Sequence, residues 1–188
     1  MDSTDETIIE LSKGKIALVL LGAVVFVIAG IWFLTLDAES IRSDRGFRLL
    51  FNSPALAYAV GVAAIAIFGF FGFSAIKQFL NKKPGLIFNS TGIVDNASAA
   101  AAGFIPWSDV LGSHIFEMQG QKMLVIMVRN PQKYIDRGGA VKRKLNKANF
   151  NMAGSPISIS SITLKANLSE LQSMFDRYHR KYGHAVAE

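Results

Sequence analysis

The sequence contains no cysteine, only three histidines and few charged residues for its length. Without cysteine the chain can form no disulfide, thiolate zinc site or iron–sulfur site, and it has no thiol nucleophile. Charged residues make up 18% of its 188 residues, whereas roughly 25% is usual in a soluble domain. Part of the chain is therefore expected to avoid water, and the length excludes a multidomain enzyme.

The shortage of charge is confined to two apolar stretches. Residues 16–36 and residues 49–76 contain no Asp, Glu, Lys, Arg or His. A helix rises about 1.5 Å per residue, so residues 16–36 cover the roughly 30 Å hydrocarbon core and exceed the apolar core of a cleaved signal peptide. Pro54 suits the first turn of a second helix. We expect transmembrane helices at about 16–36 and 51–79.

These stretches divide the chain into three parts. Residues 1–14 are expected to form an acidic N-terminal segment, residues 15–80 a two-helix transmembrane hairpin, and residues 81–188 a cytoplasmic domain. The last part is basic, because residues 77–188 hold 15 of the 20 Lys and Arg residues. A remainder of this size can bury one small hydrophobic core.

Lysine and arginine residues near the ends of the two spans predict the orientation, because cytoplasmic loops carry an excess of them. One side of the hairpin has five, namely Lys13, Lys15, Lys77, Lys82 and Lys83. The connecting loop has three, namely Arg42, Arg45 and Arg48. We expect an inner-membrane protein with both termini in the cytoplasm and residues 37–50 outside.

Neither span contains Asp, Glu, Lys, Arg or His, the usual marks of an ion path or an intramembrane catalyst, so neither activity is expected of this chain alone. The second span instead has small residues at helical spacing: Ala55, Ala57, Ala59, Gly61 and Ala63. Small residues let helix backbones approach closely. They favour packing on the first span, because helices joined by short loops are usually neighbours, and a separate partner helix is the alternative.

Beyond the hairpin the pattern changes to short extended runs and turns. It predicts strands at Leu86–Phe88, Ile93–Val94, Phe104–Trp107, Val110–Met118 and Met123–Val128. Simple alternation puts Val110, His114, Phe116 and Met118 on one face of their strand. The alanine-rich stretch Asn96–Gly103 is short and lacks an apolar face, so a loop is expected there.

The rest of this domain reads as helices around one more strand. Asn130 and Pro131 predict a capped helix start, and Gly138 and Gly139 separate it from a basic helix over about Ala140–Asn149. Isoleucines 157 and 159 alternate out of phase with Ile162 and Leu164, which predicts a bulge or kink that returns both pairs to one face.

The C-terminal segment has the pattern of an amphipathic helix. Asn167 and Glu170 form a capping-box-like start, and Gly183 ends the pattern. One stripe of the helix is apolar or aromatic: Leu168, Leu171, Phe175, Tyr178 and Tyr182. Such a stripe needs a surface to cover, and the predicted strands supply one.

Four segments carry a resemblance to a known family: Lys83–Phe88, Ile105–Val110, Asn130–Ile135 and Gly154–Ile159. They resemble segments of small bacterial membrane proteins in which two transmembrane helices precede a pleckstrin-homology-like (PH-like) domain. The resemblance covers nearly the whole chain. It implies a membrane α-helical hairpin plus an α+β domain, with a curved antiparallel sheet or barrel and a C-terminal capping helix, and it brings no catalytic residue.

The histidines and acids do not form a recognisable catalytic or metal site. His179 and His184 are five residues apart and so point to different sides of a helix, and His114 lies alone on a predicted strand. Asp109 is expected to be a turn or cap residue rather than a general base, because no second perturbed group accompanies it. We expect no catalytic residue, no metal and no cofactor.

Positive charge is the one candidate binding feature. The residues concerned are Lys82, Lys83, Lys133, Arg137, Lys142, Arg143, Lys144 and Lys147. Near a cytoplasmic leaflet, each basic residue is attracted by up to about 1 kcal/mol. A solvated surface helix is the competing interpretation, and nucleic acid is not expected, because only Tyr134 and Phe150 could stack on bases.

Together these features predict a non-enzymatic module held at the cytoplasmic face by its two helices. Its expected partners are the anionic leaflet, a protein or a second copy of the chain. The alternative is an accessory or structural subunit of a larger membrane complex, in which the small residues of the second span form the interface.

Overall fold

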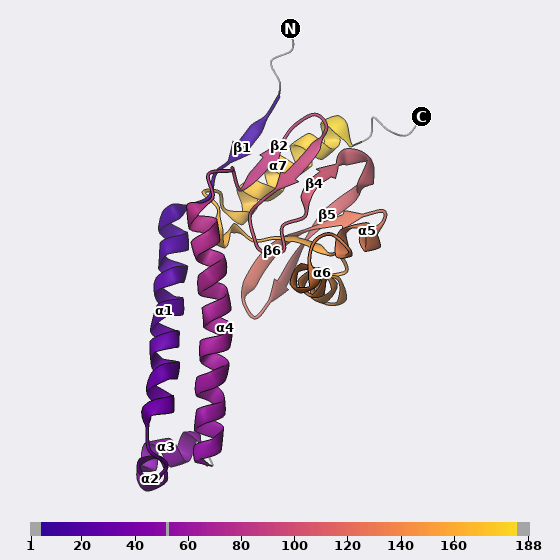
Figure 1. Cartoon of the computed structure of the whole chain (residues 1–188). Coiled ribbons are helices and arrows are strands. Elements are labelled where there is room, and N and C mark those ends of the chain that lie inside the picture. Colours follow the sequence, from indigo (N-terminus) through magenta and orange to yellow (C-terminus); the bar gives the residue numbers. More distant parts are fainter. Residues whose placement is uncertain (1–4, 52, 184–188) are drawn as a thin grey trace. The chain divides into compact units, whose positions relative to one another are not determined.

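The computed structural model describes residues 5–51 and 53–183. The chain forms two compact units. One is a helical hairpin that begins at Ile16 and ends at Asn81, and the other, called the head here, combines the residues before Ile16 with those from Lys82 onward. Figure 1 shows the helices and strands of both units.

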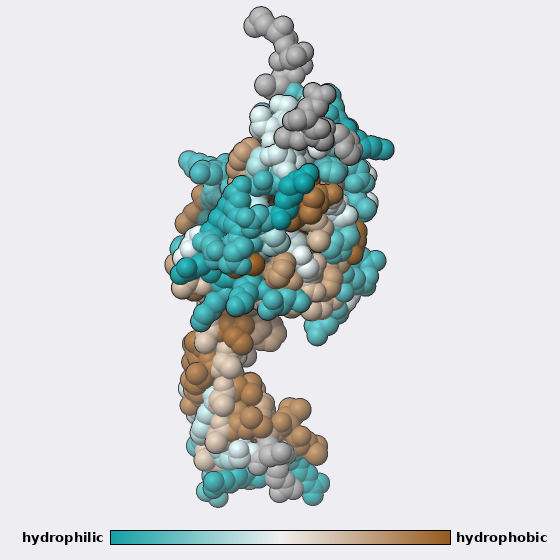
Figure 2. Space-filling view, turned by 90° about the vertical axis from the view of Figure 1, so that its right-hand side faces the viewer, coloured by the Kyte–Doolittle hydropathy of each residue, from teal (hydrophilic) through white to brown (hydrophobic). Residues whose placement is uncertain are grey.

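The hairpin consists of two long helices and a short helical connection. Its elements are α1 (Lys13–Thr35), α2 (Ala38–Ser43), α3 (Arg45–Leu50) and α4 (Pro54–Leu80). Both α1 and α4 are long and apolar enough to cross a membrane, as the sequence predicts. Apolar side chains gather over these helices (Figure 2). Ser53 caps α4 by accepting a hydrogen bond from the backbone N–H of Leu56.

Small residues allow α1 and α4 to touch. Gly30 of α1 and Gly61 of α4 are buried, and a Cβ added to Gly30 would lie 2.8 Å from the carbonyl oxygen of Gly61. The rings of Phe26 and Phe68 stack with centroids 4.1 Å apart. The helices therefore cross at glycines and pack with larger side chains elsewhere.

The head contains two antiparallel sheets. The first has the order β1–β2–β3–β4, with β1 (Thr7–Ile9), β2 (Leu86–Phe88), β3 (Gly92–Asp95) and β4 (Gly103–Pro106). The second has the order β5–β6–β7, with β5 (Val110–Met118), β6 (Gln121–Val128) and β7 (Ile157–Ile159). The predicted strands after the hairpin and the loop between β3 and β4 are confirmed, except that Gly103 already belongs to β4 and Trp107 starts a 3₁₀ turn after it.

Strand β1 comes from the chain segment before the hairpin. It pairs with β2, which follows the hairpin, with Thr7 opposite Phe88 and Ile9 opposite Leu86. Ile9 is 4% exposed, and Leu11 forms a further bridge to Leu164. The acidic segment predicted at the N-terminus thus supplies an edge strand of the head.

The remaining elements of the head are helical. They are η1 (Trp107–Asp109), α5 (Pro131–Ile135), α6 (Ala140–Ala153), η2 (Ser161–Thr163) and α7 (Leu168–Tyr182). The predicted capping box of Asn167 and Glu170 is present at the start of α7. Phe175 and Tyr178 of α7 are buried, and the ring of Tyr178 lies 5.7 Å from that of Phe88 on β2. The amphipathic terminal helix is therefore confirmed.

Two predicted details are wrong. A β-bulge between Val110 and Gly112 moves Val110 to the opposite face of β5 from His114, Phe116 and Met118. After β7 the chain does not resume a strand but makes the 3₁₀ turn η2, which leaves Ile162 48% exposed. In β5 the bulge breaks the simple alternation on which the prediction depends, and after β7 a three-residue 3₁₀ turn replaces the predicted bulge or kink.

Candidate functional site

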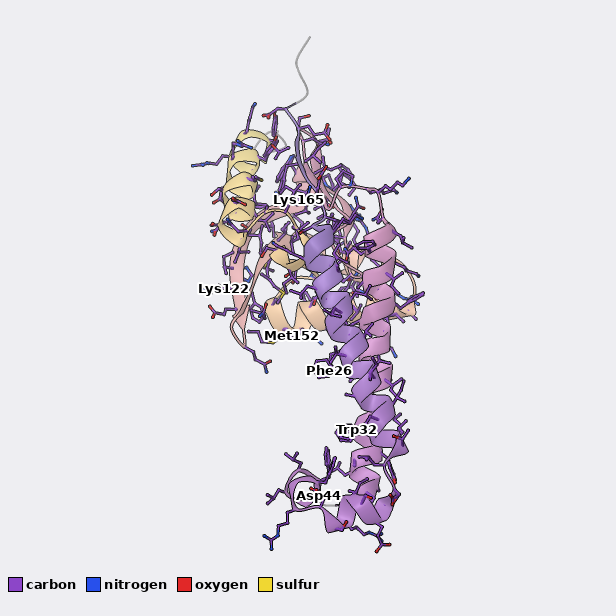
Figure 3. The ribbon with its side chains drawn as sticks, turned by 90° about the vertical axis from the view of Figure 1, so that its left-hand side faces the viewer. Phe26, Trp32, Asp44, Lys122, Met152 and Lys165 are labelled. Carbon is purple, nitrogen blue, oxygen red and sulfur yellow. The ribbon has the colours of Figure 1, made fainter. Side chains whose placement is uncertain are left out.

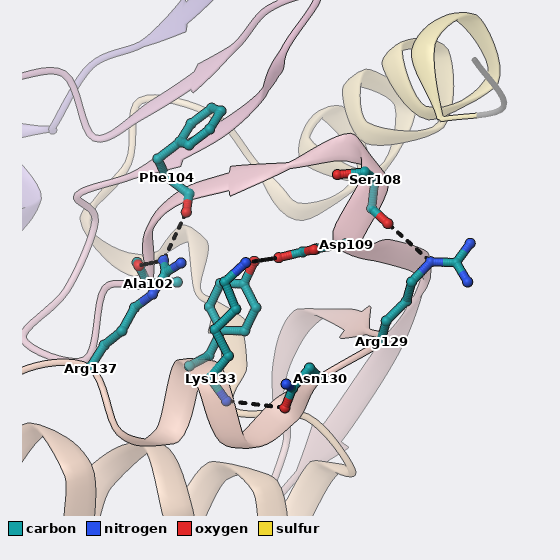
Figure 4. A network of polar contacts seen from close by, with 9 residues as sticks. Ala102, Phe104, Ser108, Asp109, Arg129, Asn130, Lys133 and Arg137 are labelled. Atoms are coloured by element: carbon teal, nitrogen blue, oxygen red, sulfur yellow. Dashed lines mark hydrogen bonds and ion pairs between the residues drawn. The ribbon is translucent and has the colours of Figure 1, made fainter. Parts of the chain in front are cut away.

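Asp109 is the centre of a polar network between η1 and α5 (Figure 4). Its Oδ2 atom accepts hydrogen bonds from Lys133 Nζ at 2.6 Å and from the Tyr134 hydroxyl at 2.7 Å. Asn130 starts α5 by accepting a hydrogen bond from the backbone N–H of Lys133. The cap therefore sets the position from which both donors reach Asp109.

The network fixes the charge of its members. Burial opposes ionisation of Asp109, but hydrogen bonds from Lys133 and Tyr134, with the charges of Lys133 and Arg137, outweigh it and lower its pKa. Burial and the neighbouring Asp109 carboxylate raise the pKa of Tyr134. At neutral pH Asp109 is an anion and Tyr134 is neutral, which suits an ion pair better than acid–base catalysis.

Arg137 ties α5 to the edge of the first sheet. Its Nη1 atom donates hydrogen bonds to the carbonyl oxygens of Ala102 and Phe104, both at 2.8 Å. Its guanidinium group lies 4.2 Å from the centroid of the Tyr134 ring. Lys133 and Arg137, two of the predicted binding cations, thus serve contacts within the head.

The four basic residues of α6 are placed differently. Lys142 is half-buried, and its charge favours the ionised form of Asp95. Arg143, Lys144 and Lys147 are exposed, and their side chains make no hydrogen bond or ion pair within the described chain. Lys82 and Lys83 are exposed in the link that follows α4. The predicted basic set therefore separates into a network pair, a helix group and a link pair.

The small residues of α4 occupy two faces. Ala57 and Gly61 are buried, and Gly61 touches α1. Ala55, Ala59 and Ala63 are exposed on the other side of the helix. The predicted set thus includes both intramolecular packing residues and residues that the hairpin leaves uncovered.

Asp95 is a buried acid that the sequence did not single out. It is 3% exposed, and its two carboxylate oxygens accept hydrogen bonds from the backbone N–H groups of Ala97 at 2.9 Å and Ala102 at 2.8 Å. Burial raises its pKa against the opposing effects of these bonds and of Lys142. Asp95 holds the alanine-rich loop closed, and an Asp two residues before a loop N–H is the sequence signal for such a turn.

The histidines lie apart. His114 is exposed on β5, whereas the ring of His179 stacks on Phe175 with centroids 5.2 Å apart. His184 lies outside the described residues. Within residues 5–51 and 53–183, no group of three or more His, Asp or Glu side chains could hold a metal ion.

Comparison with protein-family models, with curated proteins and with solved structures found no match to this chain. The arrangement of its own residues is therefore the basis for any functional proposal.

We expect Asp109→Asn to destabilise the head at neutral pH by roughly 1–2 kcal/mol, because Lys133 and Tyr134 lose a charged acceptor. The folded pKa of Asp109 lies below its unfolded value near 3.8, so its contribution is complete above that value and is lost as the pH falls through the folded pKa. The stability difference between the wild type and the variant should therefore shrink at acid pH. Thermal unfolding at neutral and acid pH measures this difference, followed by fluorescence in a Trp32→Phe background that leaves Trp107 as the single tryptophan.

Asp136→Asn is the matched control, because Asp136 is exposed and its carboxylate bonds only Gln132 of its own segment among the described contacts. It should leave the stability nearly unchanged at both pH values. A constant difference between the wild type and Asp109→Asn across the pH range would contradict the role given to the network.

Proposed function

We propose that this chain is a non-enzymatic module anchored in the cytoplasmic membrane of a bacterium. In this proposal α1 and α4 cross the bilayer, residues 37–50 lie outside, and the head lies at the cytoplasmic face. There it binds anionic lipid or a protein partner. The length and apolarity of both helices and the excess of lysine at their head-side ends support this orientation.

The pairing of β1 with β2 is the observation that carries the proposal. The chain passes from Ile9 in β1 to Lys13 at the start of α1, and from Leu80 at the end of α4 to Leu86 in β2. Because both links are short and lead to one sheet, both ends of the hairpin must emerge on the same face of a membrane. A head joined at two points to membrane-spanning helices stays at the membrane surface, and its binding partners must be present there.

The order of the strands supports a PH-like head. A four-stranded and a three-stranded antiparallel sheet are followed by the C-terminal helix α7, which packs on β2 and β6. We propose that the transmembrane hairpin replaces the ordinary turn between β1 and β2 of such a domain. The helices α5 and α6 are then an insertion between β6 and β7.

An accessory subunit of a larger membrane complex is the second candidate. The exposed face of α4 with Ala55, Ala59 and Ala63 supports it, because small residues allow another helix to approach closely. A stable hetero-complex after crosslinking in intact membranes would favour this candidate. A chain that runs as a monomer and responds to lipid would favour the first.

Single cysteines test the topology directly, since the natural chain has none. We choose three exposed positions, Glu6 before α1, Ser43 in α2 and Ser173 in α7. A membrane-impermeant maleimide applied to intact spheroplasts should label Ser43→Cys, and it should label Glu6→Cys and Ser173→Cys only after the membrane is broken. The natural chain is the blank.

If Glu6→Cys and Ser173→Cys were labelled from outside and Ser43→Cys were protected, the orientation would be the reverse of the one proposed. Labelling of Glu6→Cys and Ser173→Cys from opposite sides would exclude the pairing of β1 with β2 across a two-span hairpin. Either result would remove the proposed function.

A further inference from the structure

Helix α6 concentrates the head's uncompensated positive charge. Its fourteen residues include Lys142, Arg143, Lys144 and Lys147 and no acid. Elsewhere in the head most basic side chains are held by another group of the chain, namely Lys15, Lys122, Arg129, Lys133, Arg137, Lys165, Arg177 and Lys181. Arg143, Lys144 and Lys147 have no such partner among the described residues and are free to meet an external anion.

The same helix leaves apolar side chains in water. Val141, Ala148 and Met152 follow one another at helical spacing along one flank, and Val141 and Met152 are 57% and 48% exposed. Figure 3 labels Met152 on this helix. The buried residues of α6 are Asn146 and Ala153, so this flank is not the side that packs on the head.

The helix is firmly held from its inner side. Asn146 Nδ2 donates a hydrogen bond to the carbonyl oxygen of Tyr134 at 2.9 Å. The chain turns at Gly154, whose φ of 76° suits glycine, and the buried hydroxyl of Ser155 bonds the carbonyl oxygen of Ile126 in β6. The cations are thus presented by a fixed helix.

We propose that the outer face of α6, formed by Val141, Arg143, Lys144, Lys147, Ala148 and Met152, contacts the surface of an anionic phospholipid bilayer. The proposal rests on the proposed function, because it requires the head to be at the membrane. Basic residues beside an apolar flank are the arrangement by which amphipathic helices lie in the headgroup region, with cations at the phosphates and apolar side chains below them.

Two features favour lipid over other anions: the short links between the head and the hairpin, and the apolar side chains beside the cations of α6. The head is joined to the hairpin by short links at both ends, so the bilayer is present at high effective concentration. An acidic protein surface would meet the same cations, but it would not explain the apolar flank next to them as simply as a bilayer does. Lipid is therefore the occupant we assign.

A probe on α6 tests this in the full-length chain. Asn151 is exposed on the outer side of α6, and Asn151→Cys provides a unique site for an environment-sensitive fluorophore. In vesicles of phosphatidylcholine with phosphatidylglycerol, we expect a blue-shifted emission and a severalfold loss of quenching by acrylamide. Both effects should be absent in pure phosphatidylcholine and should weaken at about 0.5 M salt, where charges are screened within a few Å.

Two triple variants that remove equal charge separate the α6 surface from the head's total charge. Arg143→Gln, Lys144→Gln and Lys147→Gln together should abolish the lipid-dependent change. Lys122→Gln, Lys165→Gln and Arg180→Gln together remove exposed cations outside α6 and should preserve it. Fluorescence of Trp107 in a Trp32→Phe background checks that the head of each variant remains folded.

Equal quenching of the Asn151 probe in both lipid mixtures would overturn the α6 assignment. So would a lipid response that survives the α6 triple variant, or one that the control triple variant removes equally. If Asn151→Cys crosslinked to a protein in native membranes and its fluorophore stayed open to acrylamide in anionic vesicles, the occupant of the α6 surface would be a protein and not lipid. The topology labelling of Glu6, Ser43 and Ser173 is independent, so these results can fail while the proposed function stands.

Discussion

Replacing Ile9 by aspartate should unfold the head of this protein while its two long helices keep their structure. Ile9 is 4% exposed in β1 and lies opposite Leu86 of β2. An unpaired carboxylate in this core should cost more than about 4 kcal/mol, a large part of the roughly 5–15 kcal/mol that stabilises a typical domain. Pulse proteolysis of the full-length chain in mild detergent should show rapid loss of the head.

The neighbouring residue supplies the control. Ile8 is in the same strand but points the other way and is 54% exposed. Ile8→Asp adds the same charge at the same distance from the hairpin, and we expect the head to stay resistant to protease. If Ile9→Asp is equally resistant, β1 is not part of the head's core.

A leucine at Gly61 should separate the two long helices. A Cβ at this position would lie 2.9 Å from the carbonyl oxygen of Gly30 and 3.1 Å from Phe33 Cβ, so the backbones would have to move apart. Overpacking of this kind typically costs about 1–3 kcal/mol. The effect can be read by a disulfide between Ala23→Cys and Gly72→Cys, because a Cβ on Gly72 would lie 3.5 Å from that of Ala23.

The crosslink should form readily in the natural background and be strongly reduced by Gly61→Leu. Gly69→Leu is the matched control, because a Cβ built at Gly69 meets no atom within 4 Å apart from its chain neighbours and the adjacent backbone of its own helix. It adds the same side chain to the same helix and should leave the crosslink intact. Efficient crosslinking in Gly61→Leu would contradict the close approach of α1 and α4.

Much of the architecture is encoded locally and could be predicted. The two long helices follow from apolar stretches without charged residues, and the starts of α5 and α7 follow from capping residues such as Asn130 and Asn167. These features depend only on neighbours in sequence. The bulge after Val110 also had a local signal, because Gly112 inside a strand marks such irregularities.

Strand β1 could not be predicted in the same way. It has three residues, and its partner lies beyond the whole hairpin, so no local pattern announces the pair. The sequence also could not predict which basic residues are paired within the head and which are not. A count of charges does not distinguish Lys133, which pairs with Asp109, from Lys147, which pairs with no described group, because the difference is made by the tertiary position of one carboxylate.

The hairpin separates β1 from β2 in the sequence, and this constrains the order in which the first sheet can form during synthesis. Strand β1 is synthesised before α1, yet its partner β2 emerges only after α4 is complete. Strand β1 therefore has no partner to pair with until α4 has been synthesised. In the proposed topology, a chain whose second span failed to insert would hold β2 on the opposite side of the bilayer from β1, and Ile9 and Leu11, both buried in the folded head, would stay uncovered. In that topology, the first sheet can close only after both long helices have been inserted.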